Sequence, residues 1–138
     1  MTPLPGPSSY VSWRELSCHD LRRTPYPRRW RTTRARRVAA AFEAVRALHG
    51  VPLTVTSAYR TPLYNVQIGG AEASQHCEGL ALDVRPPEGV PVRTWWREVY
   101  ELAQREPALG IHYVKGYAGG WVHWDLRDGE AVIAEWEE

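Results

Sequence analysis

Residues 74–85 read SQHCEGLALDVR, in which a histidine precedes an apolar run that has a carboxylate inside it. Asp83 lies seven positions after His76, between Leu82 and Val84. Burying a carboxylate in such a run is costly unless the group is paired or bound to a cation. Residues 79–85 are therefore expected to form a buried strand whose one acidic side chain has a specific partner.

A second segment, residues 121–126, reads WVHWDL and alternates strictly. In a strand, His123 and Asp125 lie on the same face as Trp121, and the residues between them lie on the opposite face, toward the core. Two histidines and one carboxylate, with a fourth position left for water, are typical ligands of catalytic zinc. By spacing alone the assignment is open, because Asp83 could instead cap a turn or pair with a nearby arginine, with the histidines merely packed.

The flanking sequence indicates helices and short strands in two layers, an α+β domain with a small antiparallel sheet. Residues 33–49 and 91–106 carry apolar side chains at helical spacing. The expected strands are 52–58, 79–85, 110–115 and 121–127, the last two joined as a hairpin through the glycine-rich turn 116–120, with 131–136 as an edge strand. Residues 59–75 are expected to form a long irregular loop, and such loops are often functional. Residues 1–138 are interpreted as one domain, with 1–12 an extended arm.

Composition narrows the class of protein further. The chain has 138 residues, of which 43% are hydrophobic, enough to bury a core. No apolar run approaches the roughly 20 residues of a membrane span, and no secretory signal is visible at the start. Cys18 and Cys77 are too few for a disulfide scaffold or a cysteine-rich zinc module.

The charge is nearly balanced overall, at +1, but unevenly distributed. Residues 1–50 carry 10 basic and 3 acidic side chains, and eight arginines lie between Arg22 and Arg37. The remainder is acidic. This arginine segment raises a nucleic-acid hypothesis, which the acidic remainder argues against, so nucleic acid is not expected as the partner. It also suggests a surface that could attract an anionic polymer.

The motifs together resemble the zinc D-Ala-D-Ala carboxypeptidase family, which includes L-alanyl-D-glutamate endopeptidases and shares its fold with Hedgehog signalling domains. The resemblance runs from about residue 12 to 127. It rests on the segments SAYRTP (57–62), YN (64–65), GGA (69–71), SQH (74–76), GIHY (110–113) and VHWD (122–125), together with Gly79, Ala81 and Asp83.

The resemblance implies a role for individual residues. It implies one zinc ion held by His76, Asp83 and His123, and a substrate contact for Arg60. Ser74 and Gln75 match residues that line the site. Trp121, on the face of His123, is expected to line the cleft as well.

Two positions depart from the family pattern. Gly120 stands three residues before the last histidine, where many members have an acidic general base. Asp125 is the expected replacement, with Glu78 and Glu72 as weaker alternatives; Asp125 could instead orient His123 or pair with Arg127. His112 stands where related sequences often have glycine, so it either lines the substrate pocket or only packs.

The resemblance therefore implies a zinc peptidase that hydrolyses the peptide stems of bacterial peptidoglycan, as a D,D-carboxypeptidase or an L-alanyl-D-glutamate endopeptidase. The protein is expected to be a monomer. A phage or prophage lysin, made in the cytoplasm and released to the cell wall, fits the small size. The alternative is a catalytically silent zinc-containing module, such as a phage particle component, and Gly120 motivates it.

Overall fold

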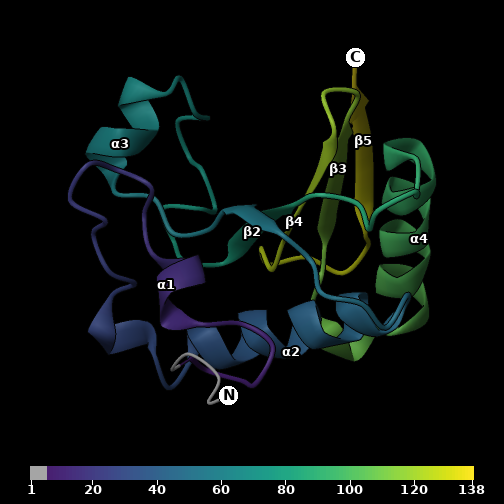
Figure 1. Cartoon of the computed structure of the whole chain (residues 1–138), viewed down its shortest axis with the longest axis horizontal. Helices are drawn as coiled ribbons and strands as arrows, with labels where there is room; N and C mark the ends of the chain where they lie inside the picture. The colour runs from purple at the N-terminus through teal and green to yellow at the C-terminus, as the bar shows by residue number, and fades with distance from the viewer. Residues whose placement is uncertain (1–5) are drawn as a thin grey trace.

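The computed structural model describes residues 6–138 and contains short helices around a single five-stranded sheet (Figure 1). The helical elements are α1 (Trp13–Leu16), η1 (Arg28–Trp30), α2 (Arg34–Ala47), α3 (Pro62–Gln67), α4 (Val92–Arg105) and η2 (Pro107–Leu109). The strands are β1 (Val55–Ser57), β2 (Ala81–Val84), β3 (Tyr113–Tyr117), β4 (Trp121–Asp125) and β5 (Ile133–Glu137). The α+β class expected from the sequence is confirmed.

The sheet has the strand order β1-β2-β4-β3-β5. Three of its four pairings are antiparallel, including the expected β3–β4 hairpin. The expectation of a wholly antiparallel sheet is wrong at one edge, because β5 pairs with β3 in parallel. β4 ends at Asp125, beside Tyr113 at the start of β3. The following loop passes to the other side of β3, where β5 begins opposite Tyr113 and runs in the same direction as β3.

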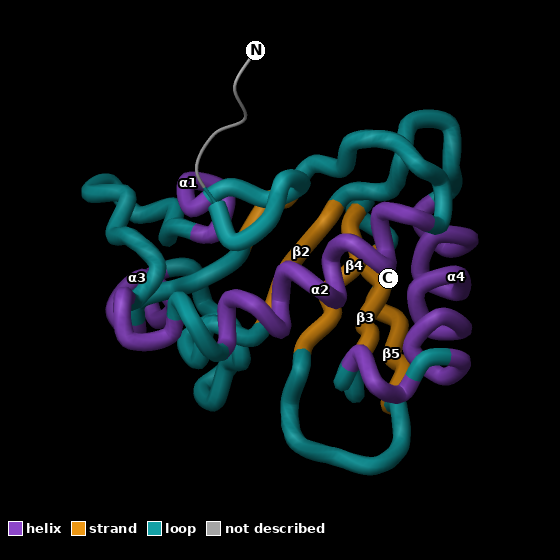
Figure 2. Tube along the Cα trace, turned by 90° about the horizontal axis from the view of Figure 1, so that it is seen from below, coloured by secondary structure: helices purple, strands orange, loops and turns teal. Residues whose placement is uncertain are grey.

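Helices α2 and α4 contribute most of the buried apolar side chains that pack against the sheet. Figure 2 shows α2 passing across the strands, with α4 beside β3 and β5. The buried residues of α2 recur every three or four positions, as in Val38, Phe42 and Val45, and form one apolar stripe. Trp95 of α4 and Trp124 of β4 are among the largest fully buried side chains. This core fixes one face of the sheet and leaves the opposite face for the polar residues.

That opposite face carries a row of polar side chains across all five strands. Register pairs Ser57 with Asp83, Asp83 with His123, His123 with Lys115, and Lys115 with Glu135. Residues that pair across neighbouring strands lie on the same face. The strict alternation of β4 therefore places His123 beside Asp83, although 40 positions separate them in the sequence.

Two stretches differ from the expectation. The segment 59–75 is not wholly irregular, because α3 forms within it. The Thr61 side chain accepts a hydrogen bond from the backbone N–H of Tyr64, and Pro62 occupies the first turn. Both are helix-start signals. Of the expected N-terminal arm, residues 1–5 lie outside the described residues, and Val11 is buried in the core.

The described helices are also too short or too polar to cross a bilayer. Over residues 6–138, none combines the length and the apolar character that a membrane span requires.

Candidate metal centre

A cleft of about 680 Å³ opens on the polar face of the sheet. One wall is the loop that follows α3, residues 68–76, and the other consists of side chains from β3, β4 and the end of β5. In Figure 1 the α3 arm and the β3–β5 strands rise on either side of β2. His76, Asp83 and His123 all line this cleft.

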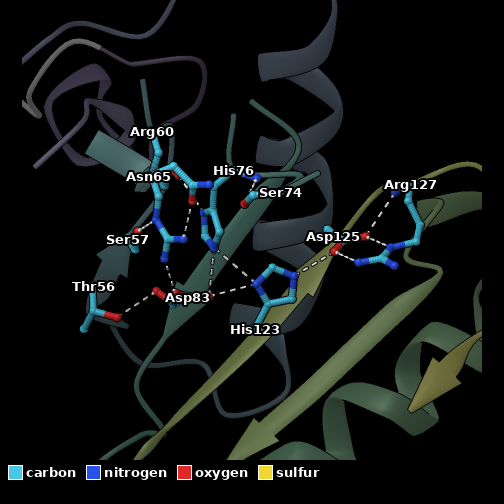
Figure 3. Close-up of polar contacts among 11 residues, drawn as sticks. Thr56, Ser57, Arg60, Asn65, Ser74, His76, Asp83, His123, Asp125 and Arg127 are labelled. Atoms are coloured by element: carbon cyan, nitrogen blue, oxygen red, sulfur yellow. Dashed lines mark hydrogen bonds and ion pairs between the residues drawn. The ribbon is translucent and has the colours of Figure 1, made fainter. Parts of the chain in front are cut away.

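These three residues bring one ligand atom each to a common point. Oδ1 of Asp83 lies 3.1 Å from Nε2 of His76 and 2.9 Å from Nδ1 of His123. The two histidine nitrogens are 3.2 Å apart. In Figure 3 the three side chains converge from a loop and two neighbouring strands. Within the described residues, they are the cluster of histidine, cysteine and acidic side chains able to hold a metal ion.

Each histidine is held by its other ring nitrogen. Nδ1 of His76 donates a hydrogen bond to the carbonyl oxygen of Ala58 at 2.6 Å, which leaves Nε2 for the cluster. Nε2 of His123 donates to Oδ2 of Asp125 at 2.7 Å, which leaves Nδ1. Such contacts fix the tautomer and orientation of metal-binding histidines.

The charges of the cluster suit a cation. Burial opposes ionisation of Asp83, but the two histidines hold the pKa of its carboxyl well below its usual range. Burial lowers the pKa of His76, which favours the neutral ring that a metal needs. Burial also opposes the charged form of His123, yet its hydrogen bonds to Asp125 and Asp83 raise its pKa.

Asp125 lies behind His123, away from the nitrogen that faces Asp83 (Figure 3). The side chain of Asp125 is fully buried. Arg127 donates a hydrogen bond to each of its oxygens, from Nε to Oδ1 at 2.8 Å and from Nη2 to Oδ2 at 2.8 Å. Burial raises the pKa of Asp125, but the hydrogen bonds from Arg127 and His123 outweigh it and lower that pKa. In this position Asp125 orients His123, and both of its oxygens are engaged by hydrogen bonds.

Arg60 approaches the cluster from the opposite side. Its Nη2 lies 3.3 Å from Oδ2 of Asp83, the carboxylate oxygen that does not face the histidines. Ser57 and Asn65 accept hydrogen bonds from its other nitrogens, at 3.1 and 3.3 Å. Arg60 lines the cleft and restrains Asp83 at the same time.

Asn65 was given no role by the sequence reasoning, although it lies within the family motif. It is buried, accepts from Arg60, and donates to the carbonyl oxygen of Ala71 at 2.8 Å. A side chain at Gly70 would stand 2.0 Å from Oδ1 of Asn65. The contact explains the glycine and ties α3 to the cleft wall.

The other predicted residues divide into two groups. Ser74, Gln75 and Trp121 line the cleft, and Oγ of Ser74 accepts the backbone N–H of His76 at 3.2 Å. His112 lies elsewhere: it lines a separate cavity beside α4, and its Nδ1 donates to the carbonyl oxygen of Arg127 at 2.7 Å. The position of His112 therefore supports a role in packing and not in lining the substrate pocket.

The two weaker alternatives expected from the sequence, Glu72 and Glu78, do not line the cleft. Glu72 and Glu78 are exposed, and Glu78 pairs with Arg34 at 3.0 Å. Gly120 sits in the β3–β4 turn with φ +113, where nothing lies within 4 Å of a Cβ position. Cys18 and Cys77 are free thiols.

Comparison with known families agrees with this geometry. The sequence profile of the family described as Peptidase M15 matches residues 14–125. The chain belongs to the Peptidase M15 family. It is therefore a zinc metallopeptidase, and its converging His-Asp-His group suits that ion. No curated protein matched the sequence.

The matched range of this M15 peptidase covers the residues that build the metal centre. It begins within α1 and ends at Asp125, so it includes the Arg60 loop, His76, Asp83 and His123. β5 follows the matched range. The parallel edge strand therefore lies outside the range matched by the family profile.

Proposed function

We propose that this M15 peptidase hydrolyses the peptide stems of bacterial peptidoglycan and acts at the cell wall. The observation that carries the proposal is the convergence of three donor atoms, from His76, Asp83 and His123, in an open cleft. A structural zinc site takes a fourth protein ligand and is closed, whereas a catalytic one keeps a position for water. The open cleft supports the catalytic kind.

In the proposed mechanism the chain supplies the geometry of the metal centre. Zinc bound by the three residues supplies a Lewis acid, which acidifies water and polarises the peptide carbonyl. Asp125 keeps the Nδ1 side of His123 turned toward Asp83. Arg60 holds Oδ2 of Asp83 and presents its guanidinium to the cleft, where it can bind a substrate carboxylate or the negative charge that develops during attack.

We assign the base to Glu137 rather than to Asp125. The acidic residues lining the cleft among the described residues are Asp83, Asp125 and Glu137. The first belongs to the metal cluster, and the second is fully buried between His123 and Arg127. Glu137 is solvent-accessible, and Lys115 holds its Oε1 at 3.1 Å. Glu137 lies two strands away from His123 in the sheet, so it would act on the metal centre through water in the cleft.

The shape of the site favours an endopeptidase. A second cavity of about 540 Å³ meets the cleft at Asp83 and Trp121 and continues past the Gly119–Gly120 turn. A peptide can therefore extend on both sides of the metal residues. Tyr117 and Trp121, stacked with ring centroids 4.5 Å apart, offer an apolar surface along this path.

Mass analysis of fragments from defined muropeptides tests the proposal. The zinc-loaded protein should release fragments cut at an internal stem bond, and a chelator should abolish their formation. Release of the terminal D-alanine alone would show a carboxypeptidase and would refute the endopeptidase assignment. No cleavage of any stem bond, with zinc bound, would refute the peptidoglycan function.

The second candidate function is a zinc-containing binding module without turnover, such as a phage particle component. Gly120 in place of an acid favours it, as does the engagement of Asp125 by Arg127. This candidate predicts retention of the protein on intact peptidoglycan with no fragments released. The same mass analysis therefore separates the two functions.

A further inference from the structure

A second surface of the chain is strongly basic and lies outside the cleft. Eight arginines occur in residues 22–37, a stretch that contains no acidic residue. We call them the arginine face: Arg22, Arg23, Arg28, Arg29, Arg31, Arg34, Arg36 and Arg37. Six of the eight are exposed, and within residues 6–138 only Arg34 has a carboxylate partner, Glu78. The rest of the chain carries nine basic and sixteen acidic side chains, so the positive charge is concentrated here.

Three of the eight arginines stack on aromatic rings. The guanidinium carbons of Arg29 and Arg34 lie 4.4 and 4.2 Å from the centre of the Trp30 ring. Arg31 lies 4.6 Å from the centre of the Trp13 ring. Guanidinium groups stacked in this way lose less conformational freedom on binding a ligand, while their N–H groups remain able to donate. These three guanidinium groups therefore have fixed positions before a partner binds.

The arginine face contacts the two backbone segments that carry Arg60 and His76. Trp30 packs edge-on against Tyr59, the residue before Arg60, at 6.2 Å between ring centres. A Cβ at Gly79, three positions after His76, would lie 2.9 Å from Trp30. Arg34 donates to the carbonyl oxygen of Glu78 at 2.8 Å. In Figure 1, η1 and the start of α2 lie on the side of the molecule that also bears α1 and α3.

We propose that the arginine face docks the protein on a phosphodiester polymer of the cell wall, a chain of alditol phosphates attached to peptidoglycan. Guanidinium groups match phosphate oxygens two at a time, and a repeating phosphate chain can meet several arginines together. Docking would hold the cleft near the peptide stems. The choice of a wall polymer rests on the proposed function, but the binding itself needs neither zinc nor turnover.

Cosedimentation of chelator-treated protein with purified cell walls tests the proposal. Walls that carry the phosphate polymer should retain the protein, and walls stripped of it with hydrofluoric acid should not. Retention should weaken steeply as ionic strength rises, because exposed charges are screened. Duplex DNA of equal phosphate content serves as the competing ligand.

Two double variants make a matched pair. Arg28→Gln with Arg36→Gln removes two exposed charges from the arginine face, whereas Arg97→Gln with Arg105→Gln removes two exposed charges from α4. The first should weaken wall binding by roughly tenfold or more, at about 1 kcal/mol for each arginine near an anionic surface. The second should stay within about twofold of the wild type, since charges beyond a Debye length are largely screened.

Several results would overturn the inference. Equal retention on stripped walls would do so, as would equal loss in the two double variants. Tighter binding to duplex DNA than to the wall polymer would assign the surface to nucleic acid instead. Cleavage of soluble muropeptides by the Arg28→Gln/Arg36→Gln variant should match the wild type. If the wild type docks but cleaves no muropeptide, the peptidase proposal fails and the docking proposal stands.

Discussion

Asp125 accepts a hydrogen bond from Nε2 of His123 and is gripped by Arg127 on its other side, so its negative charge acts on the metal centre through the histidine ring. A base needs a carboxylate oxygen free to take a proton from water, and both oxygens of Asp125 are already engaged by His123 and Arg127. Substitution of Asp125 should have different effects in the two roles, as a base or as a group that orients His123. Removing a base lowers the rate and leaves metal binding intact, whereas removing a group that orients a ligand weakens metal binding itself.

Asp125→Asn is therefore expected to weaken zinc binding by about 10- to 100-fold, the usual effect of losing such a support. Competition with a chelator of known affinity measures this change. Asp128→Asn is the matched control, because Asp128 is exposed and has no ion pair among the described residues. Unchanged zinc affinity together with a large loss of rate would return Asp125 to the role of base.

Glu137→Gln is expected to lower kcat for stem cleavage by about 100-fold or more, the range of general acid–base catalysis. Zinc affinity should not change, because Glu137 is absent from the metal cluster. Glu138→Gln at the neighbouring exposed position is the control for a change of charge alone. A Glu137→Gln variant with the wild-type rate would exclude Glu137 as the base.

The sequence could predict which side chains gather at the centre but not how they face one another. Alternation in β4 places His123 and Asp125 on one face, and the structure agrees. Strand pairing and the contact of Arg127 with Asp125 decide which ring nitrogen of His123 faces Asp83. The alternation of residues in β4 cannot predict either of them. The role of Asp125 therefore needed coordinates, as did the separation of His112 from the cleft.

At the scale of elements, the His76 loop is braced by the segment before α2. Tyr26 is buried and donates its hydroxyl to the carbonyl oxygen of Gly79 at 2.7 Å. Gly79 has φ +65, and a Cβ there would lie 2.8 Å from that hydroxyl. The glycine is thus required both by its backbone conformation and by the close approach of Tyr26.

Tyr26→Phe should lower the free energy of unfolding by about 1–3 kcal/mol, because the Gly79 carbonyl is left buried without its partner. Denaturant unfolding of the metal-free protein measures the loss. Tyr100→Phe removes a hydroxyl that accepts an exposed hydrogen bond from Gln104, and it should cost less than about 0.5 kcal/mol. Equal costs for the two variants would mean that the Tyr26 contact does not brace the loop.

The elements themselves were predicted unequally. α2 and α4 have strong apolar periodicity, and their structural bounds fall within one to two residues of the expected ones. α3 was missed because its Leu63 and Val66 side chains are exposed, so it has no apolar stripe to reveal it. The parallel pairing of β5 was missed because strand direction follows from the path of the connection, not from the composition of the strand.

In the whole molecule, the basic segment of the chain and the metal centre occupy different surfaces that are in contact. Eight of the seventeen basic side chains belong to the arginine face, a segment without acidic residues. The metal centre lies on the polar face of the sheet and is joined to that segment through Trp30, Tyr59 and the residues after His76. The sequence predicted the imbalance, but the contact between the two regions arises from residues far apart in the chain.

One zinc ion, held by His76, Asp83 and His123, is expected to make this chain a peptidase. Titration of the metal-free protein with zinc, while stem cleavage is followed, tests this expectation most directly. We expect no cleavage without metal, and activity that rises linearly to a break at one equivalent of zinc. His112→Ala should give the same titration, and His123→Ala should not reach activity at one equivalent. Full cleavage by the metal-free protein, or none at one bound equivalent, would contradict the account.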